Sequence, residues 1–232
     1  MMMDSKFVLS NKESITELNK EHKEQYNPYV NNNGSVLGFK GKDYILLASD
    51  TRLSVGYSIL SRDSRKLFQL TDHVFLASSG MYADMTNLYK NLKIRIEMYK
   101  SQNKAEPGVE NIAQLLSNTL YGRRFFPYYT FNILAGINSQ GELKMYGYDA
   151  VGSHESLDYG ANGSGKEIIA PVLDSVLKDG SYIPELNNGI DLAKTAMNAC
   201  ANRDIYTGDY LDMVIIHKDG RIESSKFNLR KD

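Results

Sequence analysis

Two pairs of helical patterns interrupt a series of strand-type runs in this chain. Runs rich in apolar and β-branched residues predict strands at residues 35–40, 44–50, 66–70, 74–79, 129–137, 143–148, 211–217 and 221–227. Apolar residues at spacings of three and four predict helices around residues 85–99, 112–120, 168–177 and 193–200. Strands grouped between helix pairs argue against regular βαβ alternation. We therefore expect an α+β fold in which helices cover two stacked sheets, a four-layer αββα sandwich.

The first 33 residues differ from the rest of the chain. Polar residues dominate residues 11–25, and Pro28 precedes an Asn-Asn-Asn-Gly run at residues 31–34. Proline, asparagine and glycine favour turns. We expect an N-terminal extension over residues 1–33 and a single domain over residues 34–232.

Charge and cysteine content exclude several classes of function. Lys and Arg total 27 against 28 Asp and Glu, whereas a dedicated nucleic-acid binder presents a strong positive field. The single cysteine, Cys200, allows no internal disulfide, and four scattered histidines form no Cys/His metal pattern. No run approaches the roughly 18 apolar residues of a membrane span. We expect a soluble intracellular protein with no metal, cofactor, nucleic acid or membrane partner.

The segment GANGSGK, residues 160–166, matches the start of a phosphate-binding loop. Such loops continue with Ser or Thr, which holds magnesium. Here Glu167 follows, and its carboxylate would repel phosphate. A glycine-rich turn that opens a helix explains the segment better than nucleotide binding does.

Charged residues stand at strand ends near the predicted core. Asp50 and Arg52 end one apolar strand, and Lys66 begins another. Unpaired charges are costly to bury, so these side chains need partners. Two interpretations fit: a structural ion-pair cluster, or a group in which Asp50 and Lys66 tune a nucleophile on the strand that begins near Gly34.

Several dispersed segments together resemble a known family. They are GSVLGFKGKDYILLASDTRLSVGYSI, Lys66, HVFLASSG, ANGSGK and ANRDIYTGD. In this order, over roughly residues 28–232, they resemble the beta subunits of the 20S proteasome, which belong to the N-terminal nucleophile hydrolase superfamily. RRFFPYYTFNI, YDAVGS, RDIYTGD and LRKD resemble one paralogue in particular, which occupies the beta-6 position. The resemblance implies the αββα sandwich of that superfamily.

In catalytic members of this family, an N-terminal threonine exposed by propeptide removal attacks the scissile carbonyl. The resemblance implies that Asp50 and Lys66 occupy the places of the aspartate and lysine that tune this nucleophile. The place of the nucleophile itself falls on Gly34, which has no hydroxyl. We therefore expect a non-catalytic subunit in which Asp50, Arg52 and Lys66 survive as structural charge pairs.

The family's supporting set falls on Ser164, Asp204 and Thr207, the last in place of a serine. An alternative nucleophile is Ser35, which would become N-terminal after cleavage at the glycine. A shift of one residue along a strand turns a side chain to the opposite face, away from the tuning lysine. An active peptidase that uses Ser35 is the first alternative. A fold relative outside the proteasome, such as a binding protein or an amidohydrolase, is the second.

The resemblance also implies an assembly. Two beta rings stack between alpha rings in the 20S core. The expected partners are beta-5 and beta-7 type neighbours, the opposite beta ring and an alpha ring. Such a subunit serves ATP- and ubiquitin-dependent protein degradation in cytoplasm and nucleus. The head resembles a propeptide or assembly extension, which a neighbouring active subunit would trim.

The loop YDAVGSHES, residues 148–156, is expected to border the active site of the beta-5 neighbour, which cleaves after apolar residues. The candidates for the substrate channel are Asp149, Ala150, Val151, Gly152 and Ser153, of which the first and last are polar. The expected role is an influence on a neighbour's specificity.

Overall fold

The computed structural model describes residues 27–178, 180 and 183–231. The chain divides into two compact units, Met1–Val30 and Asn31–Asp232, and the second contains every helix and strand described below. Most of the predicted head lies outside the described residues, so its extent over residues 1–33 stays a prediction. None of the described helices is long and apolar enough to cross a membrane.

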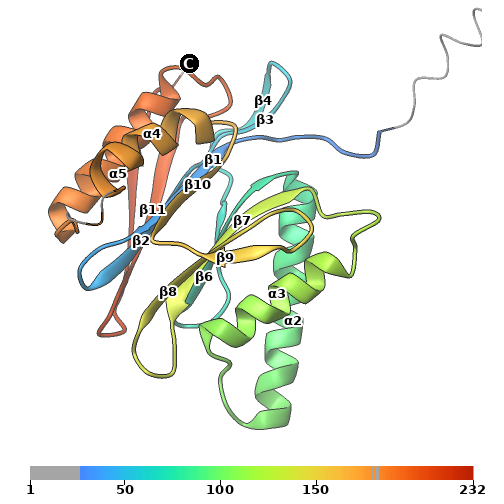
Figure 1. The fold of residues 1–232 in the computed structure, drawn as a ribbon. Helices are drawn as coiled ribbons and strands as arrows, with labels where there is room; N and C mark the ends of the chain where they lie inside the picture. The colour runs from blue at the N-terminus through green and yellow to red at the C-terminus, as the bar shows by residue number, and fades with distance from the viewer. Residues whose placement is uncertain (1–26, 179, 181–182, 232) are drawn as a thin grey trace, which may run out of the picture. The chain divides into compact units, whose positions relative to one another are not determined.

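Two five-stranded antiparallel sheets form the centre of the second unit (Figure 1). The first has the order β10-β1-β2-β11-β12, with strands Tyr159–Gly163, Ser35–Lys40, Tyr44–Asp50, Tyr210–His217 and Ile222–Asn228. The second has the order β5-β6-β7-β8-β9, with strands Leu67–Gln69, Val74–Gly80, Thr130–Ile137, Leu143–Tyr148 and His154–Ser156. β9 and β10 are edge strands and follow one another in sequence, so the chain crosses between the sheets at this edge.

Helices cover the outer face of each sheet (Figure 1). They are α2 (Tyr82–Asn103), α3 (Val109–Tyr121), α4 (Lys166–Leu177) and α5 (Leu186–Ala201). Leu88 of α2 and Leu116 of α3 belong to the apolar cluster on the second sheet. Leu173 of α4 and Met197 of α5 belong to the cluster on the first sheet. The layers are therefore helices, sheet, sheet and helices, and the expected sandwich is confirmed.

The continuous apolar run of β2 is explained by burial on both of its faces. Ile45 and Leu47 belong to the core between the two sheets. Leu46 and Ala48 alternate with them and pack under α4 and α5. This fully buried strand carries Asp50 into the interior at its end.

The sequence-based prediction omitted four short strands. β3 (Leu53–Val55) and β4 (Ser58–Ser61) form a hairpin after β2, while β9 and β10 precede α4. Strands of three to five residues that are exposed or rich in glycine carry too little alternation to be recognised. One correction concerns GANGSGK, which was expected to be a turn. Its first residues complete β10, and the turn is limited to Ser164 and Gly165.

Candidate functional site

The Asp50 carboxylate is fully buried and surrounded by hydrogen-bond donors. Its Oδ1 accepts from the Lys66 ammonium at 2.6 Å and from the Ser35 amide at 2.8 Å. Its Oδ2 accepts from the amides of Arg52 at 3.1 Å and Gly208 at 3.3 Å. Burial raises the pKa of the Asp50 carboxyl, and the Lys66 ammonium opposes that rise. The carboxylate thus joins β1, β2 and the segment before β11.

Lys66 precedes β5 and ends beside Gly34 at the start of β1. In addition to Asp50, its Nζ donates to the Arg52 carbonyl at 2.7 Å. A Cβ built on Gly34 would lie 2.1 Å from this Nζ and 2.5 Å from the Lys66 Cε. Atoms do not approach so closely, so a side chain at position 34 requires the end of the lysine side chain or the Gly34 backbone to shift.

Gly34 also has a backbone conformation that suits glycine. Its φ is +87°, in the left-handed region that L side chains rarely adopt. The position assigned to the nucleophile therefore faces Asp50 and Lys66 but carries no hydroxyl or thiol. Asp50 and Lys66 therefore pair their charges beside the Gly34 backbone and not beside a nucleophilic side chain.

A second hydrogen-bonded cluster involves the opposite side of β1. The Ser164 hydroxyl donates to Asp204 Oδ2 at 2.6 Å, and the Thr207 hydroxyl donates to the same oxygen at 2.7 Å. The Ser35 hydroxyl lies 2.7 Å from Thr207 Oγ1. Because the Thr207 proton is directed to Asp204, Ser35 donates in this contact. The three residues assigned to the supporting set thus lie in one chain of hydrogen bonds.

The Ser35 side chain is buried on the face of β1 that carries this second cluster. Its Oγ accepts from the Gly165 amide at 2.9 Å and lies 3.6 Å from Cys200 Sγ. Burial raises the pKa of the Cys200 thiol. The apolar spacing that predicts a helix at residues 193–200 already included Cys200, and its burial on that face agrees with the prediction, whereas its contact with Ser35 was not foreseen.

Arg52 contacts Asp50 and Lys66 through its backbone amide and carbonyl. Its side chain instead donates from Nε to Asp209 Oδ2 at 2.8 Å and from Nη1 to the Ile205 carbonyl at 2.8 Å. Asp209 is fully buried and also accepts from Arg62 Nη1 at 2.5 Å. Asp209 was not among the predicted site residues, although a carboxylate directly before a buried strand indicates that a cation is needed nearby.

The GANGSGK turn uses its backbone amides inside the protein. Ser164 donates its amide hydrogen to the Gly34 carbonyl at 3.1 Å, and Gly165 donates to Ser35. A phosphate-binding loop keeps such amides free for its ligand. These contacts favour the structural role of the turn.

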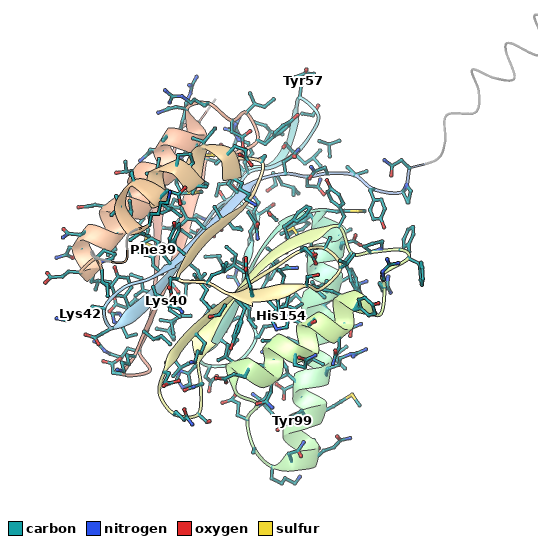
Figure 2. All side chains as sticks on the ribbon, viewed as in Figure 1. Phe39, Lys40, Lys42, Tyr57, Tyr99 and His154 are labelled. Carbon is teal, nitrogen blue, oxygen red and sulfur yellow. The ribbon has the colours of Figure 1, made fainter. Side chains whose placement is uncertain are left out.

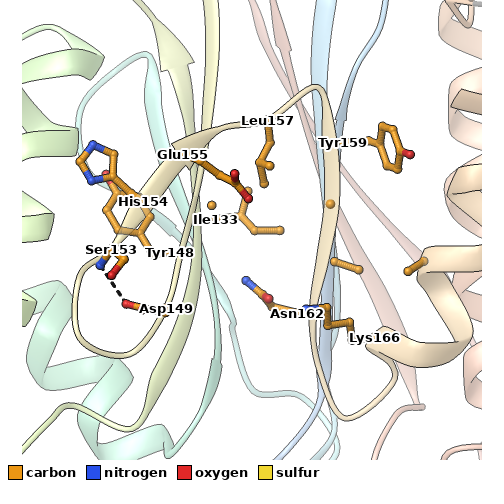
Figure 3. Close-up of a pocket in the computed structure, with 14 residues that line it drawn as sticks. Ile133, Tyr148, Asp149, Ser153, His154, Glu155, Leu157, Tyr159, Asn162 and Lys166 are labelled. Atoms are coloured by element: carbon orange, nitrogen blue, oxygen red, sulfur yellow. Dashed lines mark hydrogen bonds between the residues drawn. The ribbon is translucent and has the colours of Figure 1, made fainter. Parts of the chain in front are cut away.

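Asp149 and Ser153, at the two ends of the loop of residues 149–153, line a groove of about 500 Å³ between the outer strands of the two sheets (Figure 3). Asp149 Oδ1 accepts the amide hydrogens of Val151 at 3.0 Å and Ser153 at 2.8 Å. The Gly152 carbonyl accepts from the Ser117 hydroxyl of α3 at 2.7 Å. The loop is therefore held in one shape against α3.

The walls of this groove carry groups of both charges. Glu155 of β9 and Asn162 of β10 project into it from opposite sides (Figure 3), and Lys166 at the start of α4 lines it as well. No cluster of three or more His, Cys, Asp or Glu able to hold a metal ion occurs among the residues that the structure describes.

Comparison with known proteins decides the family. The family model for proteasome subunits matches residues 30–216. The chain belongs to the proteasome subunit family. A proteasome subunit beta type-1 from Arabidopsis thaliana is 44% identical over 225 residues, which cover 93% of this chain and 100% of that protein. The expected resemblance to proteasome beta subunits is confirmed.

Other relatives of this family agree over similar lengths. A proteasome subunit beta type-1 from Dictyostelium discoideum is 44% identical over 216 residues, 90% of this chain and 91% of its own. One from Danio rerio is 41% identical over 218 residues, 91% of each chain. The residues matched by the family model include Gly34, Asp50 and Lys66.

Proposed function

We propose that this proteasome subunit is a non-catalytic beta subunit of the 20S core, at the beta-6 position. The contact between Gly34 and Lys66 carries the proposal. No hydroxyl or thiol stands at position 34, and the lysine that would tune a nucleophile fills the space of the missing side chain. Without a nucleophilic oxygen no acyl-enzyme forms, so Asp50 and Lys66 act as structural partners.

The alternative, a peptidase that uses Ser35, is not favoured by the hydrogen bonds of this serine. Its hydroxyl donates to Thr207 and accepts from the Gly165 amide. To attack a substrate, the hydroxyl would have to leave both partners. The Lys66 ammonium donates to the Asp50 carboxylate and to the Arg52 carbonyl, and neither of these contacts involves the Ser35 hydroxyl.

The proposed partners are beta-5 and beta-7 type neighbours, the opposite beta ring and an alpha ring. Exposed apolar side chains support an assembled state, because large apolar groups left in water are typical of interfaces. Ile94 and Met98 lie on the outer side of α2, and Tyr57 lies at the tip of the β3–β4 hairpin (Figure 2). In this assembly the chain would serve ATP- and ubiquitin-dependent degradation in cytoplasm and nucleus.

The proposed influence on the beta-5 neighbour rests on residues 149–153. One carboxylate oxygen of Asp149, Oδ1, accepts hydrogen bonds from two amides of the loop itself. The other oxygen accepts no hydrogen bond from the described residues, so it is available to a group outside this chain. A carboxylate held in a rigid loop at the rim of a groove is suited to contact a passing peptide.

Native mass spectrometry of an extract from the source cells tests the proposal. We expect the chain in particles of core mass and not as a free monomer. The intact core is treated with a covalent probe for N-terminal nucleophiles and then dissociated. The label should be found on the beta-5 subunit and not on this chain. A stable free monomer would contradict the ring position, and labelling at Ser35 would contradict the non-catalytic role.

A further inference from the structure

The segment between α3 and β7 presents several exposed aromatic side chains at the surface. We call residues 121–127 the aromatic loop. Its Phe125 side chain is 94% exposed and Tyr121 is 62% exposed, while Phe126 is about half exposed. Figure 1 shows this segment projecting away from the sheet before the chain enters β7. Exposed aromatic side chains gathered in one segment mark an interaction surface.

The backbone of the aromatic loop is ordered by successive turns. The amides of Arg123, Arg124 and Phe126 donate to the carbonyls of Leu120, Tyr121 and Arg123, each at 3.0 Å. The loop is anchored below by the buried Tyr128 ring, over which the Arg123 guanidinium lies at 4.5 Å. A loop fixed in this way loses little conformational entropy on binding, which favours a lasting contact.

The loop also carries two positive charges. Arg123 and Arg124 are exposed, and neither forms an ion pair with a carboxylate in the described part of the chain. The Arg124 guanidinium lies 5.4 Å from the centre of the Phe125 ring, so charge and apolar surface are presented together. The complementary surface is an apolar pocket with carboxylates at its edge.

The aromatic loop is continuous with residues 149–153 along α3. Ser117, one turn before the end of α3, donates to the Gly152 carbonyl. A Cβ at Gly152 would lie 3.1 Å from Leu120 Cβ, so this second loop sits directly on the last turn of the helix. The aromatic loop leaves the helix at Tyr121.

We propose that the aromatic loop anchors this subunit to the ring neighbour whose substrate channel residues 149–153 border. The neighbour presents an apolar pocket for Phe125 and a rim of Asp or Glu for Arg124. This inference rests on the proposed function, because it needs the chain to stand in a ring beside that neighbour. The anchor would keep residues 149–153 at a constant distance from the neighbouring active site.

Photo-crosslinking in the assembled core tests the anchor. A photoreactive amino acid replaces Phe125 in one strain and Ser153 in another, with the full chain expressed in its own cells. We expect both positions to crosslink to the same subunit, and the peptide captured from position 125 to contain apolar residues beside Asp or Glu. If position 125 captures a different subunit, a second copy of this chain or nothing while position 153 crosslinks, the anchor is refuted.

Competition for entry into the core gives the second measurement. Tagged Phe125→Ala and Arg124→Glu chains, coexpressed with the unmodified chain, should each enter the core at least about tenfold less often. Arg124→Lys keeps the charge, and Lys42→Glu reverses an exposed charge at the β1–β2 turn (Figure 2). Both should enter as often as the unmodified chain. Equal entry of all four variants would refute the anchor, whereas failure of the unmodified chain to enter would refute the proposed function itself.

Discussion

The Lys66 ammonium lies 2.1 Å from the point where a Cβ on Gly34 would stand. Lys66 directly precedes β5 of the second sheet, and its side chain fills the space that a side chain at Gly34, directly before β1 of the first sheet, would need. The same ammonium donates to Asp50 and to the Arg52 carbonyl. The absence of a side chain at Gly34 therefore leaves the space in which Lys66 forms its buried ion pair with Asp50.

Replacement of Gly34 by threonine is expected to cost stability without creating activity. The new Cβ adds about 1–2 kcal/mol of left-handed strain. It also displaces an ammonium whose charged hydrogen bonds are worth about 1.5–3 kcal/mol each. We expect the free energy of unfolding to fall by about 3 kcal/mol or more, measured by urea denaturation, and no labelling by a probe for N-terminal nucleophiles.

Gly141→Ala is the matched control for this change. Gly141 has a φ of +78°, close to that of Gly34, but no atom lies within 4 Å of its Cβ position. It should lose only the strain, about 1–2 kcal/mol. Equal losses at positions 34 and 141 would show that Lys66 does not restrict position 34.

Removal of the Lys66 charge should be strongly destabilising. Lys66→Met leaves the Asp50 carboxylate buried without its cation, and breaking such a pair costs about 3–5 kcal/mol. The double variant Lys66→Met with Asp50→Asn removes both charges and should recover part of the loss. Urea denaturation of the two single variants and the double variant measures the coupling. Additive losses would contradict a direct interaction.

The fold was accessible from the sequence where burial left a clear pattern. The apolar run of residues 45–48 and the grouping of helices in pairs predicted two covered sheets, and the side-chain alternation of strands placed Ser35 on the face opposite Lys66. These inferences depend on local periodicity, which the sequence displays directly.

The contacts within the site were not predictable in this way, because they join segments that are distant in sequence. Arg52 pairs with Asp209, and Ser35 meets Cys200 and the Gly165 amide. No spacing rule connects residues so far apart, because the fold alone brings them together. That Lys66 fills the space at Gly34 is likewise a matter of side-chain reach, which the matching positions in the sequence did not disclose.

Asp149 offers a test of the proposed influence on the beta-5 neighbour. Asp149→Asn keeps the Oδ1 acceptor that holds the loop but removes the charge. The measured quantity is the ratio of beta-5 turnover between substrates with a basic and with a neutral residue three positions before the cleavage point. We expect this ratio to fall about fivefold in Asp149→Asn, which corresponds to the loss of a charge interaction of about 1 kcal/mol. Asp149→Ala also loosens the loop and should change the profile further. Turnover by assembled cores across a peptide series measures both effects.

The control for Asp149 is Asp158→Asn, which removes an exposed carboxylate that pairs with Lys40 outside the loop. It should leave the substrate profile unchanged. Profiles of the Asp149 variants that coincide with that of the unmodified core would remove the proposed role of the loop.

The buried phenol of Tyr148 should make stability fall at alkaline pH. It donates to the Ala113 carbonyl of α3 at 2.8 Å, and burial raises its pKa well above the ordinary value. An unfolded tyrosine ionises at a pKa of about 10, so the contribution of Tyr148 is complete below that pH and is lost as the pH rises above it. Tyr148→Phe should lower the free energy of unfolding at neutral pH by about 1 kcal/mol and reduce the alkaline loss. Urea denaturation across this pH range measures both effects, with Tyr57→Phe as the exposed control that should alter neither. If the free energy of unfolding of Tyr148→Phe falls at alkaline pH by as much as that of the unmodified chain, the fall is caused by groups other than Tyr148.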